Sequence, residues 1–398
     1  MDEIQKANLL ADMKKYPCQY SREIMYEYIS SGELTINDLV YDGNILTDSA
    51  YNHILRFPKL RDEQRPLPVV RSSTPYSEEG NLDVLLWGVP GVGRKMFLSG
   101  LLSLTGQLGF RFEPRVKSGA YACELCNYSR FSFVPPRFME SYIQVIDAQL
   151  NNESQDIARI SFVEMPNEKL VELYERINNK KSTSVKPLCH KPHKGIKAVL
   201  NLLKRTHTNT NEIFFEDLGH GADGILNNQN RKIIFLFIEP ENKVCADFYD
   251  KTTKEFRQVR NSDVIEKLIF FLDQHPSFLK KVEGIHIILT KCDYFGEHVD
   301  QNVILDKLNE QGYSAVLSRI KEICKKYDIN KQTGSLVGLH PFCVGKFMPG
   351  DVYKFDETYS LMIFRVIQKY ITTGSSYGPL SGFSEPRFKD FLSNNFLI

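Results

Sequence analysis

The chain has 398 residues, of which 42% are hydrophobic and 25% charged, and its formal net charge is +1. This length is enough for two or three domains, or for one large domain with additions, and the 26 Phe and 19 Tyr argue against a disordered chain. A net charge close to zero excludes a global attraction to DNA or to membrane surfaces.

The apolar runs and the first residues bear on location. No apolar run approaches the ~20 residues that cross a bilayer, and the start of the chain, MDEIQKANLLADMKKYPC, lacks the basic residues and apolar block of a signal peptide. The 8 cysteines are scattered without a disulfide-like rhythm, which fits a reducing compartment. We therefore expect a cytoplasmic location and no membrane partner.

Four segments follow one another along the chain. Residues 1–60 are predicted to form a small helical unit, in which glycines separate successive helices. The stretch 61–80 is polar, contains proline and has no periodicity, so we expect a linker. From residue 81 to 375, strand-like runs alternate with helical stretches, which predicts an α/β domain. Residues 376–398 follow as a C-terminal tail.

Within the α/β domain, the apolar runs predict a mostly parallel sheet flanked by helices. LDVLLW is a candidate buried strand before the helix RKMFLSGLLSLTG, and IQVIDAQL and ARISFVEM read as adjacent strands of a hairpin. RKIIFLFIE, GIHIILT and LHPFCVGKF are the next predicted strands, and SLMIFRVIQKYI is the closing helix. Residues 169–212 depart from this pattern with ten Lys or Arg against three Glu, and we interpret them as a basic insertion.

The first candidate site is the glycine-rich turn after LDVLLW. Gly88, Gly91 and Gly93 have the spacing of a phosphate-binding loop, in which backbone N–H groups and a helix N-terminus hold an anion. Such loops continue with a Lys that reaches the outer phosphates and a Ser or Thr that holds magnesium. Here Arg94 keeps the charge on a bulkier planar head, and Lys95 cannot ligate a cation. The alternative is a strand-to-helix turn without a ligand.

A second motif closes the strand GIHIIL, where the chain reads Thr290-Lys291-Cys292-Asp293. Together with the loop upstream, it resembles the [NT]KxD box of the TRAFAC class of P-loop GTPases, which have a Ras-like core. The resemblance implies that Asp293 accepts two N–H bonds from guanine and that the stem of Lys291 lies along the base. A carboxylate accepts but cannot donate hydrogen bonds, so it selects guanine over adenine. The alternative is an ordinary polar strand end.

Other boxes of that class are altered. At the DxxG position after ARISFV the chain has Glu164, which could hold magnesium through water, and Asn167 replaces the glycine. The expected first switch loop lacks a Thr and carries Phe138 instead. The fifth box is matched by Gly345 and Lys346, which the resemblance places behind the guanine carbonyl. The base-reading side is therefore intact by this comparison, and the magnesium side is damaged.

A wider stretch, roughly residues 81–372, is similar to GTPase-like proteins of Bacteroidetes-type bacteria. The similarity is carried by NRKIIFLFIEP, VIEKLIFFLDQH, GIHIILTKCDYF and GKFMPGDVYKFDETYS. It implies a bacterial GTPase-like fold and carries no assigned reaction.

Two further constellations compete for a role. The potential zinc ligands are Cys123, Cys126, Cys189, His190 and His193. The gap between the two clusters is far from zinc-finger spacing, so buried or incidental cysteines are the alternative. The loop FFEDLGHGADG offers Asp217 as a candidate for holding magnesium or positioning water, with a plain acidic turn as the alternative.

These observations predict a guanine-nucleotide-binding protein with GTP or GDP as its ligand, acting as a switch or assembly module with a protein partner. Hydrolysis is expected to be slow or absent, as in a pseudo-GTPase, since magnesium loses two usual anchors, and the need for magnesium stays open. One rival is an active NTPase with metal held by Glu164 or Asp217. The other is an interaction protein that binds nucleic acid or an acidic partner through the basic insertion.

Overall fold

The computed structural model describes the helical start of the chain and most of the predicted α/β domain. The described residues are 1–56, 77, 79–89, 91–104, 110–114, 121–123, 125–126, 143–152, 156–165, 222–250, 255–292, 301–331 and 338–374. The basic insertion, the C-terminal tail and most of the linker lie outside them. Within these ranges, no helix combines the length and the apolar character that a bilayer crossing requires.

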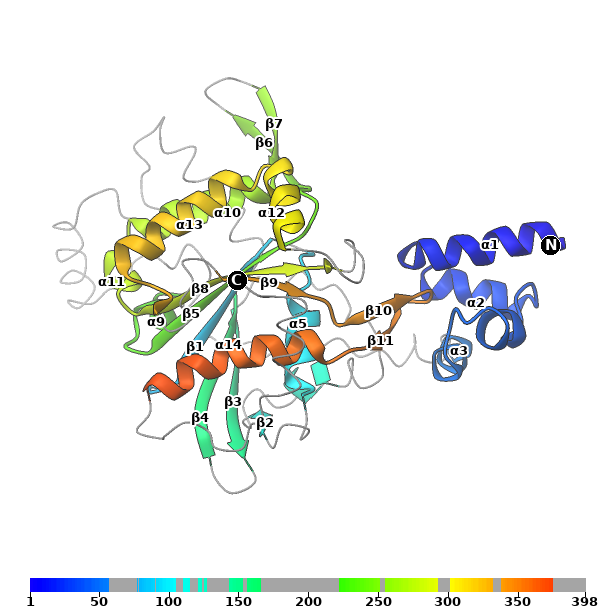
Figure 1. Cartoon of the computed structure of the whole chain (residues 1–398), viewed down its shortest axis with the longest axis horizontal. Helices are drawn as coiled ribbons and strands as arrows, with labels where there is room; N and C mark the ends of the chain where they lie inside the picture. Colours follow the sequence, from blue (N-terminus) through cyan, green and yellow to red (C-terminus); the bar gives the residue numbers. More distant parts are fainter. Residues whose placement is uncertain are drawn as a thin grey trace, which may run out of the picture.

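A seven-stranded sheet lies at the centre of the α/β part, in the order β2-β3-β4-β1-β5-β8-β9 (Figure 1). Its strands are β1 (Leu82–Gly88), β2 (Phe110–Pro114), β3 (Gln144–Asn152), β4 (Asp156–Glu164), β5 (Arg231–Ile238), β8 (Val282–Thr290) and β9 (Gly338–Phe342). The strands β4, β1, β5, β8 and β9 run parallel, whereas β2 with β3 and β3 with β4 pair antiparallel. The structure therefore confirms the mostly parallel sheet and the predicted hairpin of IQVIDAQL and ARISFVEM.

Helices cover both faces of this sheet, which explains why its central strands are apolar without alternation. The helices are α5 (Arg94–Leu102), α9 (Ala222–Asn227), α10 (Asn261–Asp273), α11 (Pro276–Leu279), α12 (Gln301–Glu310), α13 (Ser314–Tyr327) and α14 (Thr358–Gly374). Figure 1 shows α10 and α13 on one side of the sheet and α5 and α14 on the other. Trp87 stacks on Phe278 of α11 at 6.2 Å between ring centroids. On the opposite face, Phe97 of α5 meets Phe237 at 4.9 Å.

Residues 1–56 fold into the predicted small helical unit, which has a core of its own. Its elements are α1 (Glu3–Lys15), the 3-10 turn η1 (Pro17–Gln19), α2 (Arg22–Ser30), the π-helical turn η2 (Asn37–Tyr41) and α3 (Asp48–Leu55). Side-chain oxygens of Asp2, Ser21 and Thr47 accept bonds from backbone N–H groups in the first turns of α1, α2 and α3. These caps satisfy donors that a helix start leaves unpaired.

A hairpin joins the helical unit to the sheet (Figure 1). Its strands, β10 (Gly345–Met348) and β11 (Val352–Phe355), pair antiparallel between β9 and α14. At its tip, the Gly350 N–H donates to the Tyr20 carbonyl at 2.7 Å. The Arg22 N–H donates to the Asp351 carboxylate at 3.2 Å, and Val352 is buried in the core of the helical unit. The hairpin is thus fixed to both parts of the molecule.

Substitution of Gly350 by Ala is expected to lower the free energy of unfolding by about 1–3 kcal/mol. Its φ is 92°, and a Cβ would lie 2.5 Å from the Cδ1 of Ile54. Gly32→Ala is the matched control, because Gly32 has a similar φ of 76° with nothing within 4 Å of the added Cβ. Urea unfolding followed by circular dichroism should give the larger loss at Gly350. Equal losses would show that the contact with Ile54 is not limiting.

Two features of the chain differ from the sequence prediction. LHPFCVGKF was predicted as one strand, but β9 ends at Phe342 and Gly345 opens a separate two-stranded sheet. The Asp356 N–H donates to the Val344 carbonyl at 2.9 Å, so the backbone turns out of the line of β9 between the two strands. Apolar content predicts a strand but carries no signal for this turn. A second ribbon, β6 (Val244–Asp250) with β7 (Glu255–Arg260), interrupts the chain between β5 and α10.

Candidate functional site

The turn after β1 has the backbone that its glycine spacing predicts. Gly91 and Gly93 have φ values of 77° and 92°, and α5 begins at Arg94 directly after them. A Cβ at Gly88 would lie 2.9 Å from the Cβ of Phe237 in β5, so a side chain is excluded where the loop leaves the sheet. The turn therefore brings the first N–H groups of α5 to the carboxyl-terminal edge of the sheet, an arrangement that binds phosphate in many proteins.

Thr290, the first residue of the TKCD motif, contacts this loop directly. Its buried hydroxyl lies 2.6 Å from the carbonyl oxygen of Val92 and 3.0 Å from that of Ile238. A hydroxyl has one hydrogen, so the two acceptors share it. The contact joins the loop after β1 to the ends of β5 and β8, at the edge where open α/β sheets bind ligands.

Substitution of Thr290 by Val should cost about 1–2 kcal/mol of unfolding free energy, because an isosteric apolar side chain leaves the two carbonyls without their donor. Thr290→Ser keeps the hydroxyl and is the matched control. Thermal or chemical denaturation compares the two variants. A Ser variant that is as unstable as the Val variant would mean that the methyl group, and not the hydroxyl, stabilises this junction.

A buried carboxylate holds the second residue of TKCD. Lys291, with a φ of 55°, places its Nζ 2.5 Å from the Oε2 of Glu239, which directly follows β5. The Nδ2 of Asn261 donates to the other oxygen at 3.2 Å, and the Nζ of Lys243 lies 3.6 Å from Oε2. Burial disfavours the charged form of Lys243, but the carboxylates of Glu239 and Glu241 outweigh it and raise its pKa. The Lys291 side chain is thereby oriented by a fixed partner.

Arg94 turns its guanidinium toward the ends of β1 and β4. Its Nη1 donates to the Leu86 carbonyl at 3.1 Å and also to the Met165 carbonyl, and its Nη2 lies 3.7 Å from the Oε1 of Glu164. The Tyr121 hydroxyl donates to the other oxygen of Glu164 at 3.0 Å. Arg94 is only 6% exposed. Both hydrogen bonds of Nη1 therefore go to backbone carbonyls of the protein. That Arg94 neutralises phosphate, as its place in the loop suggests, stays a prediction.

The remaining predicted nucleotide residues are only partly described. Asp293 and Asp217 lie outside the described residues, as do Phe138 and Asn167. Gly345 and the exposed Lys346 open β10, which is separated from the end of β9 by two residues. Lys346 lines a cavity of about 510 Å³ together with residues 354–357.

The zinc hypothesis is also described in part. Cys123 is exposed, and the half-buried Cys126 donates from its Sγ to the Leu102 carbonyl at 3.4 Å. The ligands predicted in the basic insertion lie outside the described residues. Among the residues that the structure describes, no group of three or more His, Cys, Asp or Glu is placed to hold a metal ion.

Sequence reasoning missed two residues of this site, Glu239 and Tyr121. Glu239 had a signal, because it is the first charged residue after the apolar part of β5, at the end that faces the loop. Tyr121 had none, since its contact with Glu164 joins segments that are distant in the sequence.

Together these features define the class of the fold. The first parallel strand leads through a glycine turn into a helix, and TKCD ends a strand of the same parallel set. The order β3-β4-β1-β5-β8-β9, with β3 antiparallel to β4, places both motifs at the same edge. The chain has a P-loop NTPase fold, a mostly parallel α/β sheet flanked by helices, with a small N-terminal helical unit.

A scan against protein-family models and a search of curated proteins gave no match. Among solved structures, the chain is similar to the S. cerevisiae Ski7 GTPase-like domain bound to GTP, at 12% identity and a TM-score of 0.31. That alignment covers 75% of this chain and 51% of the other, so the chain spans about half of the Ski7 structure.

Two further solved structures are similar at the same low level. The signal recognition particle receptor SRb-GTP/SRX complex from Chaetomium thermophilum is 12% identical, with a TM-score of 0.26 and coverage of 67% and 90% of the two chains. The LeoA bacterial dynamin GTPase from ETEC is 10% identical, with a TM-score of 0.24 and coverage of 85% and 37%. Because these TM-scores are below 0.5, the fold assignment rests on strand order and loop geometry. The similarity to Bacteroidetes-type proteins stays a prediction.

Proposed function

We propose that the chain binds a guanine nucleotide at the carboxyl-terminal edge of its sheet. The observation that carries the proposal is the 2.6 Å contact between the Thr290 hydroxyl and the Val92 carbonyl. It brings the first residue of a motif of the guanine-reading type against a loop of the phosphate-binding type, which supports a single site for base and phosphates. In this proposal residues 81–375 form the nucleotide domain of a cytoplasmic switch or assembly module that a protein partner recognises.

The roles of the residues follow from their chemistry. The N–H groups of residues 93–95 hold the phosphates, and the carboxylate of Asp293 accepts from the N–H groups of guanine. The stem of Lys291 lies along the base, held in place by its ion pair with Glu239. Lys346 and the backbone of Gly345 lie behind the guanine carbonyl group.

The same proposal includes slow or absent GTP hydrolysis. Hydrolysis requires an in-line water and compensation of the charge on the γ-phosphate, usually by magnesium. Lys95 stands where the metal-holding hydroxyl is needed, so the reaction lacks that anchor. A turnover near ~1 s⁻¹, typical of working enzymes, would contradict this part of the proposal.

The nucleotide proposal is tested by thermal unfolding with GTP, GDP, ATP or no ligand. Ligands that bind only the folded state stabilise it by about 2.7 kcal/mol at a hundredfold excess over Kd, so GTP and GDP should raise the midpoint and ATP should not. Asp293→Ala should lose the guanine response, whereas Asp306→Ala, an exposed change in α12, should keep it. Equal shifts with ATP and GTP would refute guanine selection. Salt-sensitive oligonucleotide binding without any nucleotide shift would favour the rival interaction protein.

A further inference from the structure

Nucleotide sites of the P-loop type ordinarily use magnesium, and the residues present here do not fit it. Mg²⁺ requires oxygen ligands in near-octahedral geometry, and the residue after the basic one in the loop ordinarily supplies a hydroxyl. Lys95 occupies that position, and an ammonium group has three donors and no lone pair to give. The first turn of α5 therefore offers a metal a positive charge where it needs a ligand.

The carboxylate of Glu164 is already engaged by protein donors. Glu164 ends β4, in register with Leu86 of β1, and is 5% exposed. Its Oε1 faces the Arg94 guanidinium at 3.7 Å, and its Oε2 accepts from the Tyr121 hydroxyl at 3.0 Å. Tyr121 is itself 1% exposed, so water does not replace it readily. A metal bound to Glu164 would lie beside the Arg94 guanidinium, whose positive charge opposes a second cation there.

The guanidinium of Arg94 is surrounded by oxygen atoms of the protein. The carbonyls of Leu86 and Met165 accept from Nη1, and the carboxylate of Glu164 lies beside Nη2. Two carbonyl oxygens and a carboxylate are the donor set that holds a hard metal cation elsewhere. Here they surround a delocalised cation that does not lose its proton and is fixed to the chain.

We propose that the Arg94 guanidinium is a resident cation that takes the place of the divalent metal, so that the protein binds its nucleotide free of magnesium. The inference rests on the proposed function, and it specifies that the ligand is the nucleotide without a bound metal ion. The N–H groups of the loop and the Lys95 ammonium bind the phosphates of the metal-free nucleotide. The ion pair between Arg94 and Glu164 stays intact when the nucleotide binds.

The test measures the affinity of the full chain for GDP and for GTP by isothermal titration calorimetry, once in excess magnesium and once in excess EDTA. The affinity for each nucleotide should be equal in the two buffers within about threefold, or tighter in EDTA. A larger gain with magnesium would overturn this inference and leave the proposed function intact. No binding of either nucleotide in both buffers would overturn the proposed function itself, and this inference with it.

A double variant provides the complementary result. Arg94→Lys with Lys95→Ser restores the ordinary loop, and it should acquire a magnesium dependence of about tenfold or more. Lys95→Ser alone keeps the resident guanidinium and is the matched control, which should stay insensitive to magnesium. A folded double variant that binds nucleotide equally well in both buffers would overturn the role of Arg94. If the double variant does not fold, the wild-type comparison decides the question alone.

Discussion

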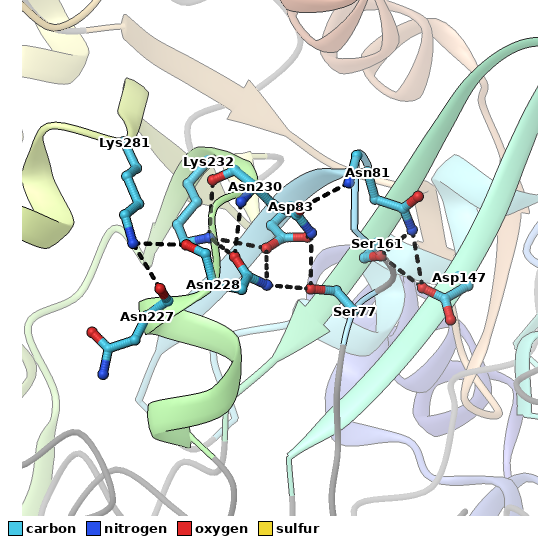
Figure 2. Close-up of polar contacts among 11 residues, drawn as sticks. Ser77, Asn81, Asp83, Asp147, Ser161, Asn227, Asn228, Asn230, Lys232 and Lys281 are labelled. Carbon is cyan, nitrogen blue, oxygen red and sulfur yellow. Dashed lines mark hydrogen bonds and ion pairs between the residues drawn. The ribbon is translucent and has the colours of Figure 1, made fainter.

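Replacement of Asp83 by Ala is expected to lower the free energy of unfolding by about 3–5 kcal/mol, because the buried Lys232 ammonium loses its counter-charge. The Nζ of Lys232 lies 3.1 Å from the Oδ2 of Asp83, and both side chains are 0% exposed. Figure 2 shows Asn228 and Asn230 donating to the same carboxylate, at 3.1 and 3.0 Å. Burial lowers the pKa of Lys232, and Asp83 opposes that effect. Urea unfolding of wild type and variant measures the loss.

Two controls separate burial from charge. The double change Asp83→Leu and Lys232→Met removes both charges, and it should recover most of the stability. Glu322→Ala breaks a 2.6 Å ion pair with Arg319 on α13, where Glu322 is 63% exposed, and should cost less than about 1 kcal/mol. The prediction fails if Asp83→Ala costs no more than Glu322→Ala.

This polar network lies near the amino-terminal ends of the parallel strands, whereas the glycine-rich loop follows the carboxyl-terminal end of β1. Asp83 is the second residue of β1, and Gly88 is the last. At about 3.3 Å per residue in a parallel strand, the two are roughly 17 Å apart. Variants of the network should therefore change stability while the folded protein keeps its affinity for nucleotide.

The strands, their mostly parallel arrangement and one hairpin could be predicted from the sequence, whereas the order and register of the parallel strands could not. LDVLLW and RKIIFLFIE are apolar runs of strand length, which a sheet covered on both faces requires. LDVLLW contains Asp83, and RKIIFLFIE contains Lys232 directly after its first residue; this pattern leaves both charges without an explanation. The explanation is the parallel register of β1 with β5, which sets Asp83 beside Lys232. Register arises from tertiary contacts, so no local signal could have revealed the ion pair.

The candidate site shows the same division. The loop glycines and TKCD are local patterns, because a tight turn and a strand end each need particular residues in sequence. The partners of Lys291 and Arg94, namely Glu239 and Glu164, depend on how β4 and β5 lie beside β1. In the sequence, Arg94 therefore shows only a positive charge at the basic position of the loop. The fold instead gives that charge a partner inside the protein.

A second network, between β8, β9 and α14, contains two histidines, of which His286 is fully buried and His340 is half-buried. The Nδ1 of His286 lies 3.0 Å from the Nε2 of His340, and its Nε2 lies 2.7 Å from the hydroxyl of Tyr370. That hydroxyl donates to the Oδ1 of Asn330 at 3.3 Å. All of these contacts are satisfied when His340 donates to His286 and His286 donates to Tyr370, with both rings neutral. A further proton on either ring would set two donors against each other or leave a charge buried.

Acid is therefore expected to destabilise the fold through this pair. Burial lowers the pKa of His340 to about 4 and that of His286 well below 6.5, and the charge of Lys369 adds to both effects. In the unfolded chain these histidines bind protons near pH ~6.5, whereas in the folded chain they stay neutral to a lower pH. Their contribution to the free energy of unfolding is therefore complete above pH ~6.5 and falls as the pH drops toward ~4. His340 contributes at most about 3 kcal/mol to this loss, because its side chain is only half-buried.

In urea unfolding across this pH range, the free energy of unfolding of His340→Gln should fall less steeply than that of wild type. His53, whose pKa is also lowered to about 4, is present in both proteins and cancels in the difference, so parallel curves would contradict the prediction.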